Sequence, residues 1–152
     1  MCTKMKNSSY LRISPSVSVP KSDVECICFY DSRPVSAFFA RAKNEGSGFR
    51  TDTGAKTVII TKNREIFLSP YQVKTYIEKL DEGDFIRTDS RCYILESEVK
   101  QIITRLNKQY SDLIREKKKD GLFLNVARGK KVTAWILTKS GMLYACRKIM
   151  SN

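Results

Sequence analysis

The sequence predicts an α+β domain in which antiparallel sheets of meander strands pack against two amphipathic helices. Two observations support this fold class. Short segments rich in β-branched and aromatic residues alternate with turn-forming clusters along much of the chain, which is typical of antiparallel strands. Two longer segments carry apolar residues at helical spacings, which indicates helices that bury one face. The hydrophobic fraction of 41% supports a folded chain.

The N-terminal part begins with a segment that offers little to pack. Residues 1–22 are rich in serine and contain two prolines, so we expect a flexible N-terminal arm there. From Val24 onward the composition changes to β-branched and aromatic residues separated by turn formers. A meander of four strands is predicted, at residues 24–30, 35–43, 56–61 and 64–68.

A first helix is predicted after Ser69-Pro70, because a hydroxyl residue suits the N-cap and proline suits the first helical position. We place its end at Gly83. Its apolar face comprises Val73, Tyr76, Ile77 and Leu80. Residues 85–88 and 91–95 flank Asp89-Ser90 and predict a hairpin.

A second helix is predicted over residues 97–118, and three strands follow it at residues 122–127, 131–138 and 142–149. The turns between these strands are basic and contain glycine. We expect the helix to pack on the domain's own sheet, and a homodimer through its stripe stays open. The stripe comprises Val99, Ile102, Ile103, Leu106, Tyr110, Leu113 and Ile114.

The length of 152 residues predicts one domain, at residues 23–152. The order of elements also allows two similar half-units, at about residues 23–83 and 84–152. No apolar run approaches the roughly 20 residues of a membrane helix, and the N-terminus lacks the apolar core of a secretion signal. We therefore expect an intracellular protein, in the nucleus or the cytoplasm.

The net charge of +12 is concentrated in the C-terminal third. Residues 99–152 carry thirteen Lys and Arg against three acidic residues, whereas residues 69–98 carry four against seven. A localised positive field attracts nucleic-acid phosphates, because their neutralisation releases condensed counterions. The charge distribution therefore predicts a nucleic-acid partner.

The absence of histidine makes catalysis less expected, since it excludes histidine-activated nucleophiles and histidine metal ligands. No C-x-x-C pair is present, so we expect reduced, structural thiols with no metal and no cofactor. The five cysteines are Cys2, Cys26, Cys28, Cys92 and Cys146.

A metal-dependent nuclease is the enzymatic alternative. Asp89 with Glu98-x-Lys100 loosely imitates the Asp and Glu-x-Lys arrangement that holds magnesium in such enzymes. However, Glu98 and Lys100 fall at a predicted helix start, where acidic residues suit the helix dipole. We therefore expect no enzymatic activity.

The last three strands can be sorted by face, since alternate residues of a strand point to opposite sides. We assign one face to the core and the other to aromatic rings mixed with amines, which can stack unpaired bases and hold phosphates. The alternative is that Trp135 and Tyr144 are core residues. The predicted nucleic-acid-binding residues are Phe123, Trp135 and Tyr144 for stacking, Arg128, Lys130, Lys131, Lys139, Arg147 and Lys148 for phosphate, and Arg41, Lys62 and Arg64 in the first meander.

Residues 62–80, KNREIFLSPYQVKTYIEKL, resemble the last strand, serine-containing turn and amphipathic helix of the Pur-alpha, Whirly and positive-cofactor-four group of single-stranded DNA binders. The similarity covers about 20 residues closely. The second half departs from the group's pattern, because its long helix precedes three strands. The resemblance implies a curved antiparallel sheet that binds exposed bases, often in a dimer or a paired-repeat arrangement.

Together these observations predict a non-enzymatic protein that binds single-stranded DNA or RNA on a basic, aromatic sheet face, with a role in transcription, replication or their regulation. The alternative is a protein-interaction or regulatory module, a host- or virus-encoded factor. Such a module would bind its partner through the helix stripe or through the acidic patch Asp81, Glu82 and Asp84.

Overall fold

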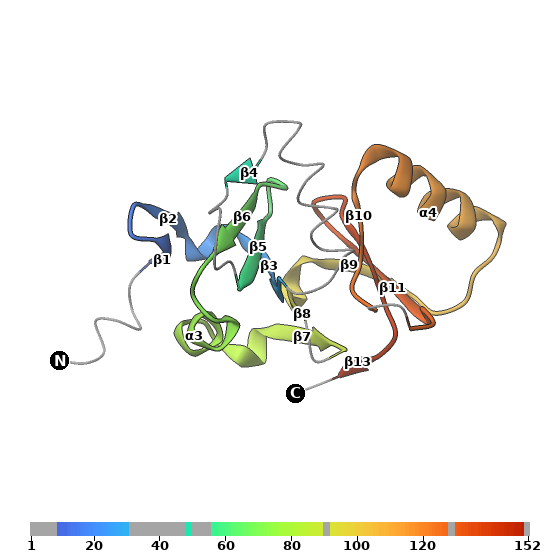
Figure 1. Ribbon diagram of the computed structural model, residues 1–152. Helices are drawn as coiled ribbons and strands as arrows, with labels where there is room; N and C mark the ends of the chain where they lie inside the picture. Colours follow the sequence, from blue (N-terminus) through green and yellow to red (C-terminus); the bar gives the residue numbers. More distant parts are fainter. Residues whose placement is uncertain (1–8, 31–47, 50–55, 90–91, 128–129, 151–152) are drawn as a thin grey trace.

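The computed structural model describes residues 9–30, 48–49, 56–89, 92–127 and 130–150. In these residues thirteen strands form three sheets, accompanied by two α-helices and three short 3-10 turns (Figure 1). The predicted α+β class is therefore wrong, because the described protein is mostly β. The helices cover outer faces, and the main core lies between two sheets.

A seven-stranded sheet has the strand order β13-β7-β8-β3-β5-β6-β4, and all its pairs are antiparallel except β4 with β6. The predicted strands in this region are confirmed, except that residues 35–43, and Arg41 with them, lie outside the described residues. The strands are β3 (Val24–Phe29), β4 (Gly48–Phe49), β5 (Thr57–Thr61), β6 (Ile66–Ser69), β7 (Phe85–Thr88), β8 (Cys92–Leu95) and β13 (Ile149–Met150).

A four-stranded sheet has the order β10-β12-β11-β9. Its strands are β9 (Val99–Ile103), β10 (Phe123–Asn125), β11 (Ala134–Thr138) and β12 (Leu143–Cys146). Strand β12 lies between β11, its antiparallel partner, and β10, its parallel partner, so the last three strands do not form a simple meander. The two proposed half-units are not separate either, because β7, β8 and β13 share the larger sheet with β3–β6.

The predicted helix at residues 97–118 is wrong in its first half. Residues 99–103 form strand β9, which pairs antiparallel with β11. The apolar residues here are β-branched, and a sheet partner decides in favour of the strand. Helix α4 (Lys108–Asp120) begins after Asn107, whose side-chain oxygen accepts from the amide of Tyr110 at 2.8 Å. It ends at Gly121, which has a φ of 75°.

Leu106 consequently lies in the connection between β9 and α4, and its side chain is 50% exposed. We expect Leu106→Ala to change the free energy of unfolding by less than about 0.5 kcal/mol, as for other exposed positions. A chemical denaturation curve measures this change. A loss of 2 kcal/mol or more, about the value of a buried leucine, would contradict the placement of Leu106 outside the core.

A third layer covers the outer face of the seven-stranded sheet. It contains the hairpin of β1 (Tyr10–Ser14) and β2 (Val17–Pro20) together with helix α3 (Val73–Lys79), on the left of Figure 1. Residues 10–20, expected in a flexible arm, instead bury Leu11, Ile13 and Val19. Tyr76 joins helix α3 to strand β1, because its hydroxyl donates to the carbonyl of Arg12 at 2.9 Å.

Helix α3 is shorter than predicted, because Ser69 ends strand β6 and does not cap the helix. The Ser69 hydroxyl accepts from the amide of Tyr71 at 3.0 Å and contacts the Tyr76 hydroxyl at 2.5 Å. Burial raises the pKa of Tyr76 to about 12, against the opposing hydrogen bond from Ser69. No helix of the described residues is long and apolar enough to span a membrane.

The main core fills the space between the two larger sheets. The seven-stranded sheet contributes residues such as Cys26, Val58 and Ile94, and the four-stranded sheet contributes Ile136 and Tyr144. On the opposite face of the four-stranded sheet, α4 packs through Ile114, on the right of Figure 1. The β11–β12 turn therefore comes near to both the larger sheet and the C-terminal part of α4.

Candidate nucleic-acid interface

Two hairpin turns of the same construction, one from each large sheet, meet at one place. In the β5–β6 turn the amide of Arg64 donates to the carbonyl of Thr61, and in the β11–β12 turn the amide of Gly141 donates to Thr138. Both turns contain three residues, and their third residue has a positive φ, 66° at Arg64 and 98° at Gly141. This pattern is the usual one for three-residue hairpin loops. The two turns are in contact, because the Arg64 side chain reaches residues 140 and 141.

Arg64 is an unusual residue for its position. Left-handed backbone is favourable for glycine, and a residue with a Cβ atom has a cost there of roughly 1–2 kcal/mol. The guanidinium reaches the turn of the other sheet, where Nη1 donates to the carbonyl oxygen of Ser140 at 2.6 Å. Backbone strain of this kind is concentrated at functional sites.

Lys117 of α4 approaches the same turn. A Cβ atom placed on Gly141 would lie 3.5 Å from Nζ of Lys117 and 3.6 Å from Nη1 of Arg64. The two cationic groups are therefore no more than about 7 Å apart, close enough for one phosphate to contact both. Lys139, two residues before Gly141 in the same turn, is exposed. We call Arg64, Lys117 and Lys139 the turn site.

The turn site is supported from its underside. The amide of Lys139 donates to the carbonyl of Glu98 at 2.8 Å, and the Glu98 carboxylate pairs with Nζ of Lys62 at 3.5 Å. Lys62, a predicted phosphate ligand, is therefore half-buried and already paired with a carboxylate. Thr138 and Ser140 are joined by a hydroxyl hydrogen bond of 3.0 Å. The turn is thus held in place before any ligand binds.

A buried carboxyl group, Glu25, lies between the sheets beneath this turn. A bulge in β3 between Val24 and Cys26 turns its side chain inward, and Oε2 accepts from the Tyr144 hydroxyl at 2.6 Å. Burial raises the pKa of Glu25, while hydrogen bonding from Ser140, Tyr144 and Thr138 opposes this rise. Nothing in the sequence singled out this residue, since a lone glutamate in a strand is usually exposed.

The predicted stacking face is wrong at Tyr144. This residue is fully buried between the sheets, and its hydroxyl is bound to Glu25. In the ladder of β11 and β12, Tyr144 lies opposite Ile136, whereas Trp135 lies opposite Ala145. Residues opposite each other share a face, so Tyr144 and Trp135 point to different sides of the sheet. Burial raises the pKa of Tyr144 well above its ordinary value.

Trp135 and Phe123 share the opposite face, where α4 packs. Both side chains are half-buried against the cluster of Ile114, Leu137 and Leu143. Nζ of Lys118 also lies 5.0 Å from the centre of the Phe123 ring, within the range of a cation–π contact. The open aromatic surface that the sequence predicted is therefore largely occupied by the helix.

Other predicted phosphate ligands gather at the opposite end of β11. Asp89, with a φ of 53°, accepts from the amides of Arg147 and Lys148 at 2.9 Å each and fixes that segment. Thr133 donates its hydroxyl to the carbonyl of Arg147 at 2.5 Å. Four basic side chains at this end are exposed, and we call them the distal cluster: Lys130, Lys131, Arg147 and Lys148. The predicted ligand Arg128 lies outside the described residues.

The residues of the nuclease alternative are not brought together. Asp89 follows β7 at the turn of the β7–β8 hairpin, and Glu98 lies beyond the other end of β8. Both carboxylates have structural partners, as described above. The apolar stripe of the predicted second helix, proposed as a protein-binding surface, is divided as well. Its first residues lie in strand β9, and its last residues lie in helix α4, which packs on the sheet.

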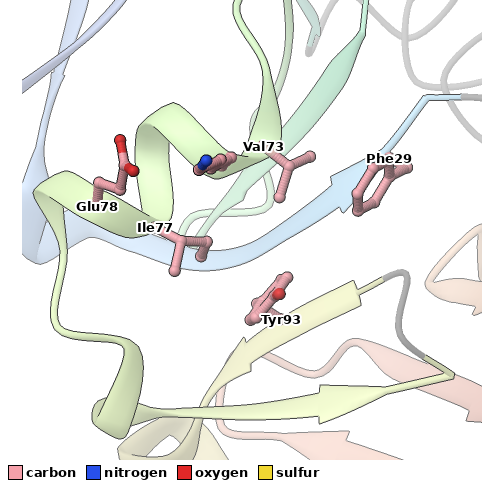
Figure 2. A pocket seen from close by; sticks show the side chains of 6 residues that line it. Phe29, Val73, Ile77, Glu78 and Tyr93 are labelled. Carbon is pink, nitrogen blue, oxygen red and sulfur yellow. The ribbon is translucent and has the colours of Figure 1, made fainter.

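A pocket of about 330 Å³ lies on the other side of the molecule, between α3 and the sheet. Figure 2 shows Phe29, Val73, Ile77 and Tyr93 around a common space, with Glu78 on the helix beside it. Lys74 also lines this pocket and is exposed. The pocket belongs to the layer of α3, separate from the turn site.

Comparison with known proteins gave one family. Residues 10–80 are similar to the RemA-like family, described as extracellular matrix regulatory protein A-like. The match covers just under half of the chain, from β1 to α3, and includes Arg64. It is a different family from the Pur-alpha, Whirly and positive-cofactor-four group that residues 62–80 resemble. A search among curated proteins found no match.

Proposed function

We propose that this protein binds nucleic acid through phosphate contacts at the turn site and acts as a regulator without catalytic activity. The observation that carries the proposal is the position of Arg64. It occupies left-handed backbone, and its guanidinium contacts the β11–β12 turn near the ammonium group of Lys117. Two cations held near each other before ligand binding suit an anionic oxygen.

Phosphate contacts, and not base stacking, are the basis of this proposal. Tyr144 is buried, and Trp135 and Phe123 are half-covered by α4. Lys139 and the distal cluster keep exposed cationic ends. Contacts to phosphate position a nucleic acid without reading its sequence, so we expect affinity with weak dependence on base sequence.

The distal cluster extends the proposed path. The five residues of β11 separate it from the turn site, a distance of about 17 Å at about 3.3 Å per residue. Adjacent phosphates of one strand of duplex DNA are about 3.4 Å apart along the axis. A nucleic acid that contacts both groups would therefore span about five nucleotides.

A regulatory role is supported by the family match. The RemA-like description names a regulatory protein, and the matched residues contain Arg64 but neither Lys117 nor the distal cluster. We therefore infer that the N-terminal half supplies the part shared with that family. The C-terminal sheet and α4 add most of the positive charge.

Titration of labelled oligonucleotides, followed by fluorescence anisotropy, tests the proposal. Single-stranded and duplex DNA and RNA of about 20 nucleotides are compared at about 0.05 M and 0.2 M salt. We expect binding that weakens by a factor of ten or more between these salt concentrations. The absence of salt-dependent binding to any of these ligands would eliminate the proposed function, and the relative affinities decide between single strands and duplexes.

A further inference from the structure

Three cysteine side chains meet inside the core between the sheets. Cys26 and Cys28 lie on the same face of β3, and Cys92 of β8 lies directly opposite Cys28. All three Sγ atoms lie within 4.8 Å of one another, and those of Cys26 and Cys92 are 3.2 Å apart. Each side chain is at most 1% exposed. The sheet thus joins thiols that are more than sixty residues apart in the sequence.

An unpartnered polar atom points into the same place. Thr88 of β7 lies directly opposite Cys92, on the side of β8 away from β3, so its side chain shares the face of the three thiols. Its residue is fully buried, and Oγ1 approaches the Cys92 thiol but makes no hydrogen bond of ordinary geometry in the described part of the chain. A buried hydroxyl without a partner is costly, and a bound ligand would satisfy it.

The thiols already interact as a group. The Sγ atoms of Cys26 and Cys92 are at the distance of a sulfur hydrogen bond, and both side chains are completely buried. A metal ion would bind these sulfur atoms as thiolates. Cys146, on the facing sheet, is also buried but lies outside this group.

We propose that Cys26, Cys28, Cys92 and Thr88 form a structural site for a thiolate-binding divalent cation of the zinc class. Zinc–sulfur bonds of about 2.3 Å place the sulfur atoms of a tetrahedral site about 3.8 Å apart, which falls within the 3.2–4.8 Å range of the three thiols. The Thr88 hydroxyl, on the same face as the thiols, would complete the coordination as a weak neutral oxygen ligand.

Charge favours a divalent ion. Three thiolates with a divalent cation leave one net negative charge in the core, whereas a monovalent cation such as copper(I) leaves two, and buried net charge is costly. The bound ion would join β7, β8 and β3 at the centre of the seven-stranded sheet. The site contains no substrate opening, which is typical of structural zinc sites.

Cobalt(II) titration of the full-length, reduced, metal-free protein tests this proposal. We expect one cobalt ion per chain, with sulfur-to-cobalt charge-transfer absorption, tetrahedral visible bands, and displacement of cobalt by zinc. Cys28→Ser should abolish these bands and Cys146→Ser should keep them, and each variant replaces one buried cysteine. Thr88→Val should keep the charge-transfer absorption and weaken the affinity.

The wild-type titration is decisive even where a variant fails to fold. A folded wild-type chain with reduced thiols that takes up neither cobalt nor zinc would overturn the proposal. Uptake of copper(I) alone, retention of the bands in folded Cys28→Ser, or a stable Cys26–Cys92 disulfide that excludes metal would also overturn it. The oligonucleotide titrations are independent of these results, so the two proposals can fail separately.

Discussion

Tyr144→Phe is expected to lower the free energy of unfolding by about 0.5–3 kcal/mol, the range that covers hydrogen bonds to neutral and to charged groups. The substitution removes the hydroxyl that donates to Oε2 of Glu25 at 2.6 Å, in a region that excludes water. Denaturant unfolding measures the change. Tyr110→Phe is the matched control, because its hydroxyl contacts the neutral Gln101 in a half-buried place, and we expect a smaller loss there.

The same carboxyl group predicts a dependence of stability on pH. Burial raises the pKa of Glu25 from 4.5, so the folded protein holds this proton more tightly than the unfolded chain. Linkage then requires the contribution of Glu25 to stability to fall as the pH rises from about 4.5 through the raised folded pKa. Glu25→Gln removes this dependence, so the stability of the variant relative to wild type should increase over that range.

Unfolding curves at a series of pH values measure the difference between Glu25→Gln and wild type. A difference that stays constant with pH would show that Glu25 does not titrate differently in the folded and unfolded states. If the stability of Glu25→Gln relative to wild type decreases as the pH rises, the pKa of Glu25 is lowered in the folded state. Ser140 and Thr138, which oppose the rise in the pKa of Glu25, belong to the turn at the proposed interface, so this pH dependence also reports on the support beneath the turn site.

The double variant Arg64→Asn/Lys117→Ala is expected to weaken oligonucleotide binding by about 10- to 100-fold at about 0.1 M salt, since each lost phosphate contact removes one counterion-release contribution. Asparagine tolerates left-handed backbone, so the turn should keep its shape and the free energy of unfolding should change little. Loss of binding without loss of stability distinguishes a ligand contact from a structural one.

Arg12→Ala/Lys74→Ala is the matched control for that experiment. It also removes one arginine and one lysine, but both lie in the layer of β1 and α3, and Lys74 borders the pocket in Figure 2. We expect a much smaller loss of affinity, because only the general field of the protein is reduced. Equal losses in both double variants would show that net charge, and not the turn site, carries the binding.

Much of the strand pattern could be predicted from the sequence, because β-branched segments separated by turn formers gave β3, β5, β6, β7, β8, β11 and β12. The residues of β12 were assigned to the wrong faces of the sheet, because the assumed register was wrong by one residue. The three-residue turn after Thr138 places Thr138 opposite Met142, and therefore Ile136 opposite Tyr144. Loop length fixes register, and a shift of one residue reverses every side chain. Counting back from the turn would have placed Tyr144 in the core.

Other features could not be predicted because they depend on distant partners. Residues 99–103 carry a spacing that fits a helix, and only pairing with β11 makes them a strand. Lys117 lies near the end of α4, and its nearness to Arg64 results from the packing of α4 on the smaller sheet. Cys92 joins Cys26 and Cys28 only when β8 pairs with β3. Such contacts follow from sheet order, which local sequence patterns do not determine.

The salt dependence of oligonucleotide affinity is the most direct test of the proposed interface. The slope of the logarithm of affinity against the logarithm of salt concentration reports how many phosphates the protein neutralises. We predict that Arg64→Asn/Lys117→Ala reduces the magnitude of this slope by about 1–2 relative to wild type, and that Arg12→Ala/Lys74→Ala leaves it nearly unchanged. A slope that is the same in wild type and in Arg64→Asn/Lys117→Ala would contradict phosphate binding at the turn site.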